Sequence, residues 1–193
     1  MTPNRLHPVL LLLLLSQAVS AGAAEERFAI NPSNTLPSFE VNHMGFATQS
    51  GHFDKTRGMV VMDPQKRIGT VDISIDAHSI NTGIRQLDEV LREMDFLNVG
   101  QHPALTFRST QMKFNGDNLV AVDGIFSMLG VSRPISLKVT HYQCGIDVAS
   151  SRYVCEVDAE ASFKRSDYGM SKLIPMVSDD VKLRIKVNAA RDQ

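Results

Sequence analysis

The sequence predicts an all-β, mainly antiparallel fold with one short helix. Apolar and polar residues alternate with a period of two in several segments, turn-forming residues separate these segments, and helical spacing recurs in one segment. Each alternating segment is typical of a strand with one buried and one solvated face. We therefore expect about eight or nine antiparallel strands in meander order. The alternation is clearest in 71–78, 155–163 and 181–188, and weaker in 39–43, 105–107 and 135–139.

Turn signals separate the predicted strands. They lie at 31–34, 63–64 and 115–118, near Gly130, and at Gly145.

The segment around 104–118 carries two further signals. Asn115-Gly116 stands between two apolar runs and indicates a hairpin. Before it, the apolar parity changes from Leu105 and Phe107 to Met112 and Phe114. Such a change indicates a bulge or a strand that enters a new sheet environment.

The helical segment spans about residues 84–92. Asn81 or Thr82 is the expected N-cap. Apolar residues recur at helical spacing at Ile84, Leu87, Val90 and Leu91. The opposite, charged face includes Asp88 and Glu89, which we expect to be solvated.

An antiparallel sheet of this size must bury its apolar face. It can do so in a sandwich of two sheets or in a closed barrel. A barrel of about eight strands is just wide enough to hold side chains or one slim ligand. The alternation alone leaves open whether the interior is filled or hollow.

The first two dozen residues predict a secretory signal peptide. Arg5 precedes the apolar run 9–15, and small residues follow in 18–23. The apolar run is much shorter than the ~20 residues needed to span a bilayer. We expect cleavage after Ala21 or Ala23, so that residues 1–23 contain the leader.

Residues 24–193 are then expected to form a single exported domain. The chain has no long basic run, so nucleic-acid binding is not expected. A second apolar stretch of membrane-spanning length is also absent. In an oxidising compartment, Cys144 and Cys155 are expected to pair as a disulfide across the base of a hairpin.

The sequence carries no signature of a catalytic, cofactor or metal site among the common motifs. His43 is in phase with the inward residues Phe39 and Val41, and Arg165 follows a predicted strand. Each is either a structural residue or a contact for a ligand head group. An enzyme that uses His43 with Asp88 and Glu89 on a lipid or quinone remains an alternative, as does a filled sandwich used as an interaction module.

Several short motifs, in this order and spacing, resemble the YceI-like family over essentially the whole mature chain. The matching segments are 39–46, 51–53, 79–83, 87–99, 102–109, 124–134 (GIFSMLGVSRP), 165–170 and 179–183. The chain departs from the usual family pattern at Val90, where a histidine is common, at Phe126-Ser127 and at Phe96-Leu97. These departures bear on the identity of the ligand more than on the fold.

The resemblance implies a lipocalin-like, elongated eight-stranded β-barrel with the helix near its opening. It also implies an exported bacterial protein of the periplasm, often a homodimer, that holds a long isoprenoid or fatty-amide-like lipid without catalysis. His43 and Arg165 are the candidates for the lipid head group. The residues expected to line the lipid tunnel are Phe39, Val41, Phe53, Ile73, Ile75, Phe107, Phe126 and Leu183.

Overall fold

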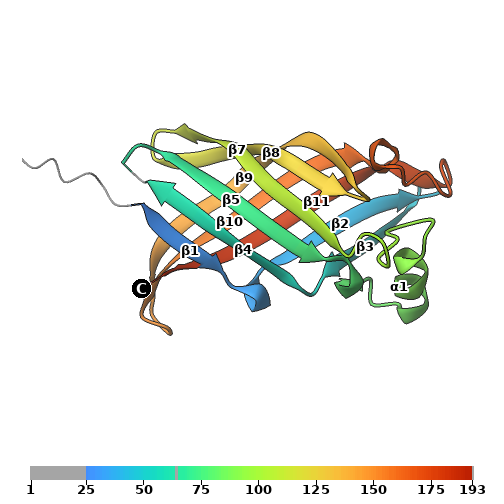
Figure 1. Cartoon of the computed structure of the whole chain (residues 1–193), viewed down its shortest axis with the longest axis horizontal. Coiled ribbons are helices and arrows are strands. Elements are labelled where there is room, and N and C mark those ends of the chain that lie inside the picture. The colour runs from blue at the N-terminus through green and yellow to red at the C-terminus, as the bar shows by residue number, and fades with distance from the viewer. Residues whose placement is uncertain (1–24, 64, 193) are drawn as a thin grey trace, which may run out of the picture.

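The period-two segments form one antiparallel sheet that closes on itself (Figure 1). The computed structural model describes residues 25–63 and 65–192. The predicted signal peptide and its cleavage site therefore lie outside the described residues. The strands are β1 (Glu26–Ile30), β2 (Leu36–His43), β3 (Ala47–Phe53), β4 (Thr56–Asp63), β5 (Ile68–Asp76), β6 (Ile80–Asn81), β7 (Ala104–Asn115), β8 (Asn118–Met128), β9 (Val131–Asp147), β10 (Arg152–Lys164) and β11 (Val177–Arg191).

Eight long strands make up the barrel, because six of the strands join end to end in pairs. A 3-10 turn, η1 (Pro32–Asn34), separates β1 from β2, and residues 54–55 separate β3 from β4. A second 3-10 turn, η2 (Ala77–Ser79), separates β5 from β6. Consecutive long strands are neighbours in the sheet, and β11 pairs with β2 along one part and with β1 along another.

This closure confirms the predicted barrel and shows that the alternative of a two-sheet sandwich is wrong. A sandwich would leave strand edges unpaired, whereas the pairing of β1 with both β4 and β11 leaves no gap in the ring. The predicted strands lie in β2, β5, β7, β9, β10 and β11, although residues 77–78 belong to η2 and not to a strand.

The two signals between residues 104 and 118 are both found in the structure. The register between β7 and β8 shifts between Ser109 and Gln111 and again before Phe114, as the change of apolar parity predicted. Asn115 pairs with Asn118, and Gly116 in the turn has a φ of 61°, which glycine adopts without steric cost. The hairpin prediction is therefore confirmed.

The Cys144–Cys155 disulfide is present and joins β9 to β10. The two residues are direct partners in the antiparallel register, close to the turn at 148–151. The predicted cystine across the base of a hairpin is thus confirmed.

The helix α1 (Arg85–Arg92) lies at one end of the barrel, and the β9–β10 turn lies with the C-terminus at the other end (Figure 1). The predicted N-cap is wrong. Ile84 occupies that position, and its side chain has no polar atom that could cap the helix. The backbone N–H and the hydroxyl of Thr82 instead donate hydrogen bonds to the buried Asp88. Asp88 is therefore not solvated as we expected.

Candidate ligand-binding cavity

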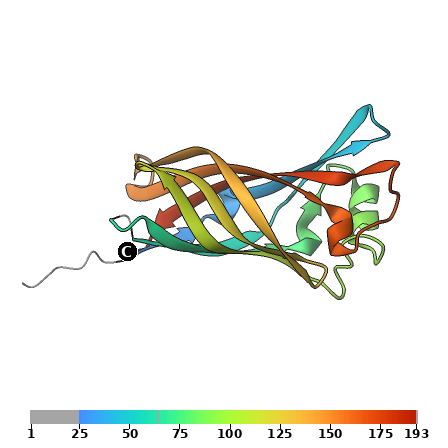
Figure 2. The same ribbon diagram turned by 90° about the horizontal axis from the view of Figure 1, so that it is seen from above.

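A cavity of about 350 Å³ occupies the α1 end of the barrel. The segments around its opening, which we call the mouth, are the β2–β3 turn (44–46), the region of α1 (84–96) and the loop 169–176. Figure 2 shows these segments at the same end of the molecule. The cavity is lined by Phe39, Val41, His43, Gln49, Phe53, Ile75, Ile80, Leu87, Val90, Leu91, Phe96, Leu97, Leu105, Phe126, Met128, Phe163, Arg165, Met170, Leu173, Val177, Val181 and Leu183.

The lining is almost entirely apolar. Three of its 22 residues are polar, namely His43, Gln49 and Arg165. All three belong to the mouth end: His43 is the cross-strand partner of Val177, Arg165 donates a hydrogen bond to the Val177 carbonyl, and Gln49 lies opposite Val41. Such a cavity favours a long apolar chain whose polar end stays near the mouth.

A second cavity of about 80 Å³ lies deeper, toward the chain termini, and shares no lining residue with the first. Phe107 stands at the division between the two. Its ring covers Gly124, where a Cβ atom would come within 2.5 Å of two ring carbons. Gly124 faces inward between Val122, which lines the deeper cavity, and Phe126, which lines the larger one. The absence of a side chain at Gly124 therefore leaves room for the ring of Phe107.

The structure places the predicted tunnel residues in two chambers rather than one. Ile73 and Phe107 line the deeper cavity. The others line the larger cavity at the mouth: Phe39, Val41, Phe53, Ile75, Phe126 and Leu183.

Sequence reasoning missed the part of the larger cavity that lies outside the strands. Leu87, Val90 and Leu91 come from α1, and Met170 and Leu173 come from the loop before β11. The helical spacing of apolar residues in the sequence marks Leu87, Val90 and Leu91 as one face of the helix, and this signal could have identified them as lining residues. The loop residues follow no period, so no local signal could have found them.

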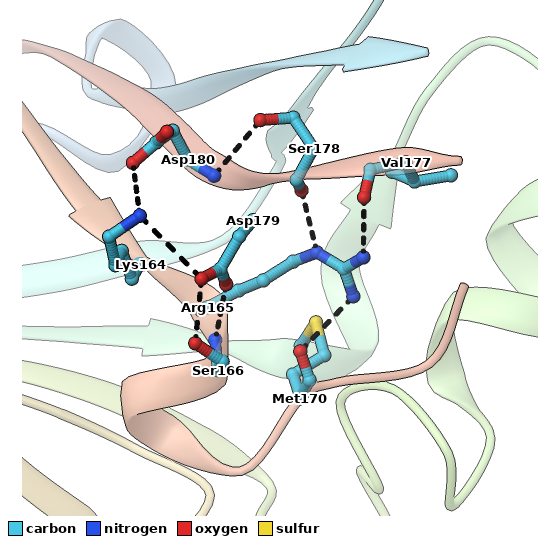
Figure 3. Close-up of polar contacts among 8 residues, drawn as sticks. All are labelled: Lys164, Arg165, Ser166, Met170, Val177, Ser178, Asp179 and Asp180. Atoms are coloured by element: carbon cyan, nitrogen blue, oxygen red, sulfur yellow. Dashed lines mark hydrogen bonds and ion pairs between the residues drawn. The ribbon is translucent and has the colours of Figure 1, made fainter. Parts of the chain in front are cut away.

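Arg165 is buried, with 3% of its surface exposed, and it holds the loop 169–176 against the start of β11 (Figure 3). Its Nε donates to the carbonyl of Ser178 at 2.9 Å, and Nη2 donates to that of Val177 at 3.0 Å. Nη1 donates to the carbonyls of Met170 at 3.1 Å and Lys172 at 2.8 Å.

These bonds use four of the five N–H groups of the guanidinium. One N–H on Nη2 has no partner among the described residues. Burial lowers the pKa of Arg165, while the negative charge of Asp179 acts in the opposite direction. Arg165 therefore shapes the mouth and retains one N–H group without a partner among the described residues.

Asp179 completes this arrangement at the start of β11 (Figure 3). Its carboxylate accepts hydrogen bonds from the backbone N–H of Ser166 at 2.9 Å and from the Ser166 hydroxyl at 2.8 Å. These bonds, chiefly the one from the backbone, lower the pKa of Asp179, with a smaller effect from the charges of Lys164 and Arg165.

The second head-group candidate, His43, is exposed at the end of β2. The carboxylates that the enzyme alternative combines with it already have partners. Asp88 accepts from Thr82, and Glu89 forms an exposed ion pair with Arg85 at 3.3 Å. Within residues 25–63 and 65–192, no three His, Cys, Asp or Glu side chains cluster so as to hold a metal ion.

Arg92 fastens α1 to the barrel. Its Nε donates to the carbonyl of His78 and Nη2 donates to that of Ile80, both at 2.9 Å. The apolar residues of the helix therefore stay over the cavity. None of the helices in the described part of the chain has the length and apolar character needed to cross a membrane.

Together these features define an antiparallel barrel with an apolar cavity open at one end. The chain belongs to the YceI-like domain family, whose model matches residues 28–189. This membership confirms the resemblance seen in the sequence motifs.

Curated relatives match over most of their length. A UPF0312 protein of Pectobacterium atrosepticum is 30% identical over 181 residues, which cover 93% of each chain. The protein YceI of Salmonella arizonae is 28% identical over 181 residues, which cover 93% of this chain and 94% of the relative. Neither name assigns an activity.

Solved structures share the fold. BcnA of Burkholderia cenocepacia superimposes with a TM-score of 0.69 at 22% identity, covering 82% of this chain and 98% of BcnA. A polyisoprenoid binding domain from Saccharophagus degradans, implicated in plant cell wall breakdown, gives a TM-score of 0.64 at 15% identity, covering 86% of this chain and 98% of that domain. At these identities the likeness concerns the fold alone.

Proposed function

We propose that this protein is a non-catalytic binding or carrier protein of the periplasm for a long-chain isoprenoid, such as a polyprenyl lipid or a quinone. The observation that carries the proposal is the cavity of about 350 Å³, whose lining is apolar except for three residues at the mouth. The solved relative described as a polyisoprenoid binding domain supports the same ligand class. The predicted signal peptide supports export.

The physical need for such a carrier follows from the hydrophobic effect. Each CH₂ group that leaves water for an apolar site stabilises the bound state by roughly 0.8 kcal/mol. A long isoprenoid tail therefore does not cross an aqueous compartment freely. An interior built from Phe, Met, Leu, Ile and Val can take up such a tail without specific polar contacts.

The polar end of the lipid is proposed to lie at the mouth. Arg165 retains one N–H donor, and Gln49 and His43 line the cavity near it. These groups suit an acceptor such as a phosphate or carbonyl oxygen. Val90, Phe96, Leu97 and Phe126 line the same cavity, and these are positions at which the chain departs from the usual family pattern. They are accordingly the residues on which the choice of lipid is proposed to depend.

Mass spectrometry of an organic extract from protein purified from its native periplasm tests this proposal. We expect one long-chain lipid in near-stoichiometric amount. The variant Val41→Trp fills the larger cavity and should carry much less lipid, whereas Val120→Trp, on the exposed face of β8, should carry as much as the natural protein.

The absence of bound lipid would contradict the proposal. If no lipid is extracted, and delipidated protein takes up neither the polyprenol solanesol nor ubiquinone, then the carrier function is wrong. Partners among proteins would become the better hypothesis.

A further inference from the structure

The mouth of the cavity carries an unusual share of exposed apolar side chains. Of the fifteen large hydrophobic residues exposed in the described chain, eight lie in the β2–β3 turn, the region of α1 and the loop 169–176. We call these eight residues the apolar rim: Met44, Phe46, Ile84, Val90, Met94, Leu173, Ile174 and Met176. The most exposed members are Phe46 at 82%, Met94 at 78%, Met44 at 58% and Met176 at 54%.

The apolar rim is continuous with the cavity. Val90 and Leu173 belong to both, since each is exposed at the surface and also lines the cavity. The backbone N–H of Met44 donates to the carbonyl of Met176 at 2.7 Å, so the β2–β3 turn and the loop are joined directly. An apolar path thus runs from the most exposed residues into the interior. Scattered single apolar residues need no explanation, but a group around one opening indicates a contact surface.

The charges around the apolar rim indicate which kind of surface it contacts. Residues 41–51 contain no Asp, Glu, Lys or Arg, and the loop 169–177 contains only Lys172. Lys172 forms an ion pair with Asp95 at 2.9 Å, which connects the loop to the chain that follows α1. Entry of the β2–β3 turn into hydrocarbon therefore requires no removal of water from a charged side chain, which would be costly. A strongly acidic or basic partner would find no complementary charge on this turn, whereas residues 84–96 carry four acidic side chains together with Arg85 and Arg92.

We propose that the apolar rim docks onto the surface of a lipid bilayer and that the isoprenoid passes directly between the bilayer and the cavity. This inference rests on the proposed lipid-binding function and adds its partner. Direct passage keeps the tail out of water throughout transfer, which avoids the free-energy cost of hydrating each CH₂ group. Figure 2 shows the β2–β3 hairpin extending outward at the α1 end. Phe46 belongs to the turn of this hairpin and is 82% exposed, so it can enter the bilayer interface first.

The kinetics of lipid transfer distinguish docking from diffusion through water. Delipidated protein is mixed with phosphatidylcholine vesicles that contain solanesol, and the protein-bound solanesol is measured over time at several vesicle concentrations. We expect a transfer rate proportional to vesicle concentration, because transfer occurs on contact. A rate independent of vesicle concentration would mean that the lipid leaves the bilayer before it meets the protein, and docking would be wrong.

Matched variants locate the contact. Phe46→Asp and Met94→Asp remove exposed apolar side chains that do not line the cavity, and each should slow transfer by about tenfold or more. Val148→Asp is the control, since Val148 is 91% exposed in the turn at the opposite end. This variant should take up solanesol from the vesicles at the rate of the natural protein. Equal rates for all four proteins would overturn the proposal.

Three further measurements distinguish membrane docking from the alternative explanations. Equilibrium uptake of solanesol from a detergent solution should be the same in all variants, and failure of every protein to take it up would refute the lipid-binding function itself. Addition of phosphatidylglycerol to the vesicles should not speed transfer, because residues 84–96 carry four acidic side chains against two arginines, and faster transfer would indicate an electrostatic contact in place of an apolar one. A dimer in sedimentation that Phe46→Asp dissociates would instead assign this surface to a second copy of the chain.

Discussion

Arg165 shows how one residue can shape a binding site without being exposed to solvent. Sequence reasoning named it either as a structural residue or as a contact for a ligand head group, and the structure places it in the lining of the cavity. Its four bonds to backbone carbonyls show that it has a structural role, with partners that residue type alone did not reveal. Two of these four partners lie in the loop 169–176, whose sequence follows no period and therefore does not predict its fold.

Replacement of Arg165 by Met should destabilise the protein strongly. Four carbonyl groups would lose their donor in a largely buried place, and we expect the free energy of unfolding to fall by about 3 kcal/mol or more. Urea unfolding measures the effect. Arg108→Met is the matched control, because Arg108 is exposed and makes only a surface ion pair with Asp72, so the loss there should stay within about 1 kcal/mol. Equal losses for both would contradict the role of Arg165.

Asp179 makes stability depend on pH in a defined direction. Its folded-state pKa lies below the usual value, so the carboxylate stabilises the fold above the unfolded pKa of about 3.9. That contribution is lost as the pH falls through the lower, folded-state pKa. Asp179→Asn should therefore unfold more easily than the natural protein at pH 7, and the difference should shrink below about pH 4. A difference that stayed constant between neutral and acid pH in urea unfolding would contradict this prediction.

At the scale of elements, the eight long strands and the short helix differ in how they are held. Each long strand is paired with two neighbours in the ring, whereas α1 is a helix of eight residues fastened by few polar contacts. Isolated helices of this length are unstable in water. The helix therefore depends on its tertiary contacts, and Arg92 and Asp88 provide the polar ones.

Arg92→Met should loosen the helix without unfolding the barrel. The variant loses the hydrogen bonds to the carbonyls of His78 and Ile80, and backbone amides in 85–92 should exchange with solvent about tenfold faster or more. Amides of β10 should be unaffected. Hydrogen exchange with mass spectrometry resolves the two regions. Arg85→Met, which removes only an exposed pair with Glu89, serves as the control and should exchange as the natural protein does.

For the molecule as a whole, the division of the interior into two cavities is the main feature. Phe107 fills the space above Gly124, and its loss should join the deeper cavity to the larger one. We expect Phe107→Ala to lower the free energy of unfolding by about 3 to 5 kcal/mol, because a large buried side chain leaves a void.

The same variant should bind longer lipid tails than the natural protein, and the chain length of co-purified lipid in mass spectrometry measures this. Val148→Ala, at an exposed position in the turn at the opposite end of the barrel, is the control and should change neither stability nor chain length. An unchanged chain length in a folded Phe107→Ala protein would mean that the tail does not reach the division.

The sequence by itself determined the strands, their inward faces, the helix, the hairpin at Asn115 and the disulfide pair. These features are local: a side chain on a strand points inward or outward according to its position in a period of two, and the cystine joins neighbouring strands of one hairpin. The alternation alone did not distinguish a barrel from a sandwich. The order and spacing of the short motifs gave the family resemblance, and that resemblance implied a barrel.

Only the tertiary structure decided how the barrel closes, how its interior is divided and what surrounds the mouth. β1 meets β11 across more than 150 residues of chain, and the same alternation would serve a filled or a hollow barrel. The volume left inside depends on how Phe107, Gly124 and their neighbours pack, and the mouth depends on a loop that Arg165 holds. Contacts between residues far apart in the chain leave no local pattern, which is the physical reason that these features required the structure.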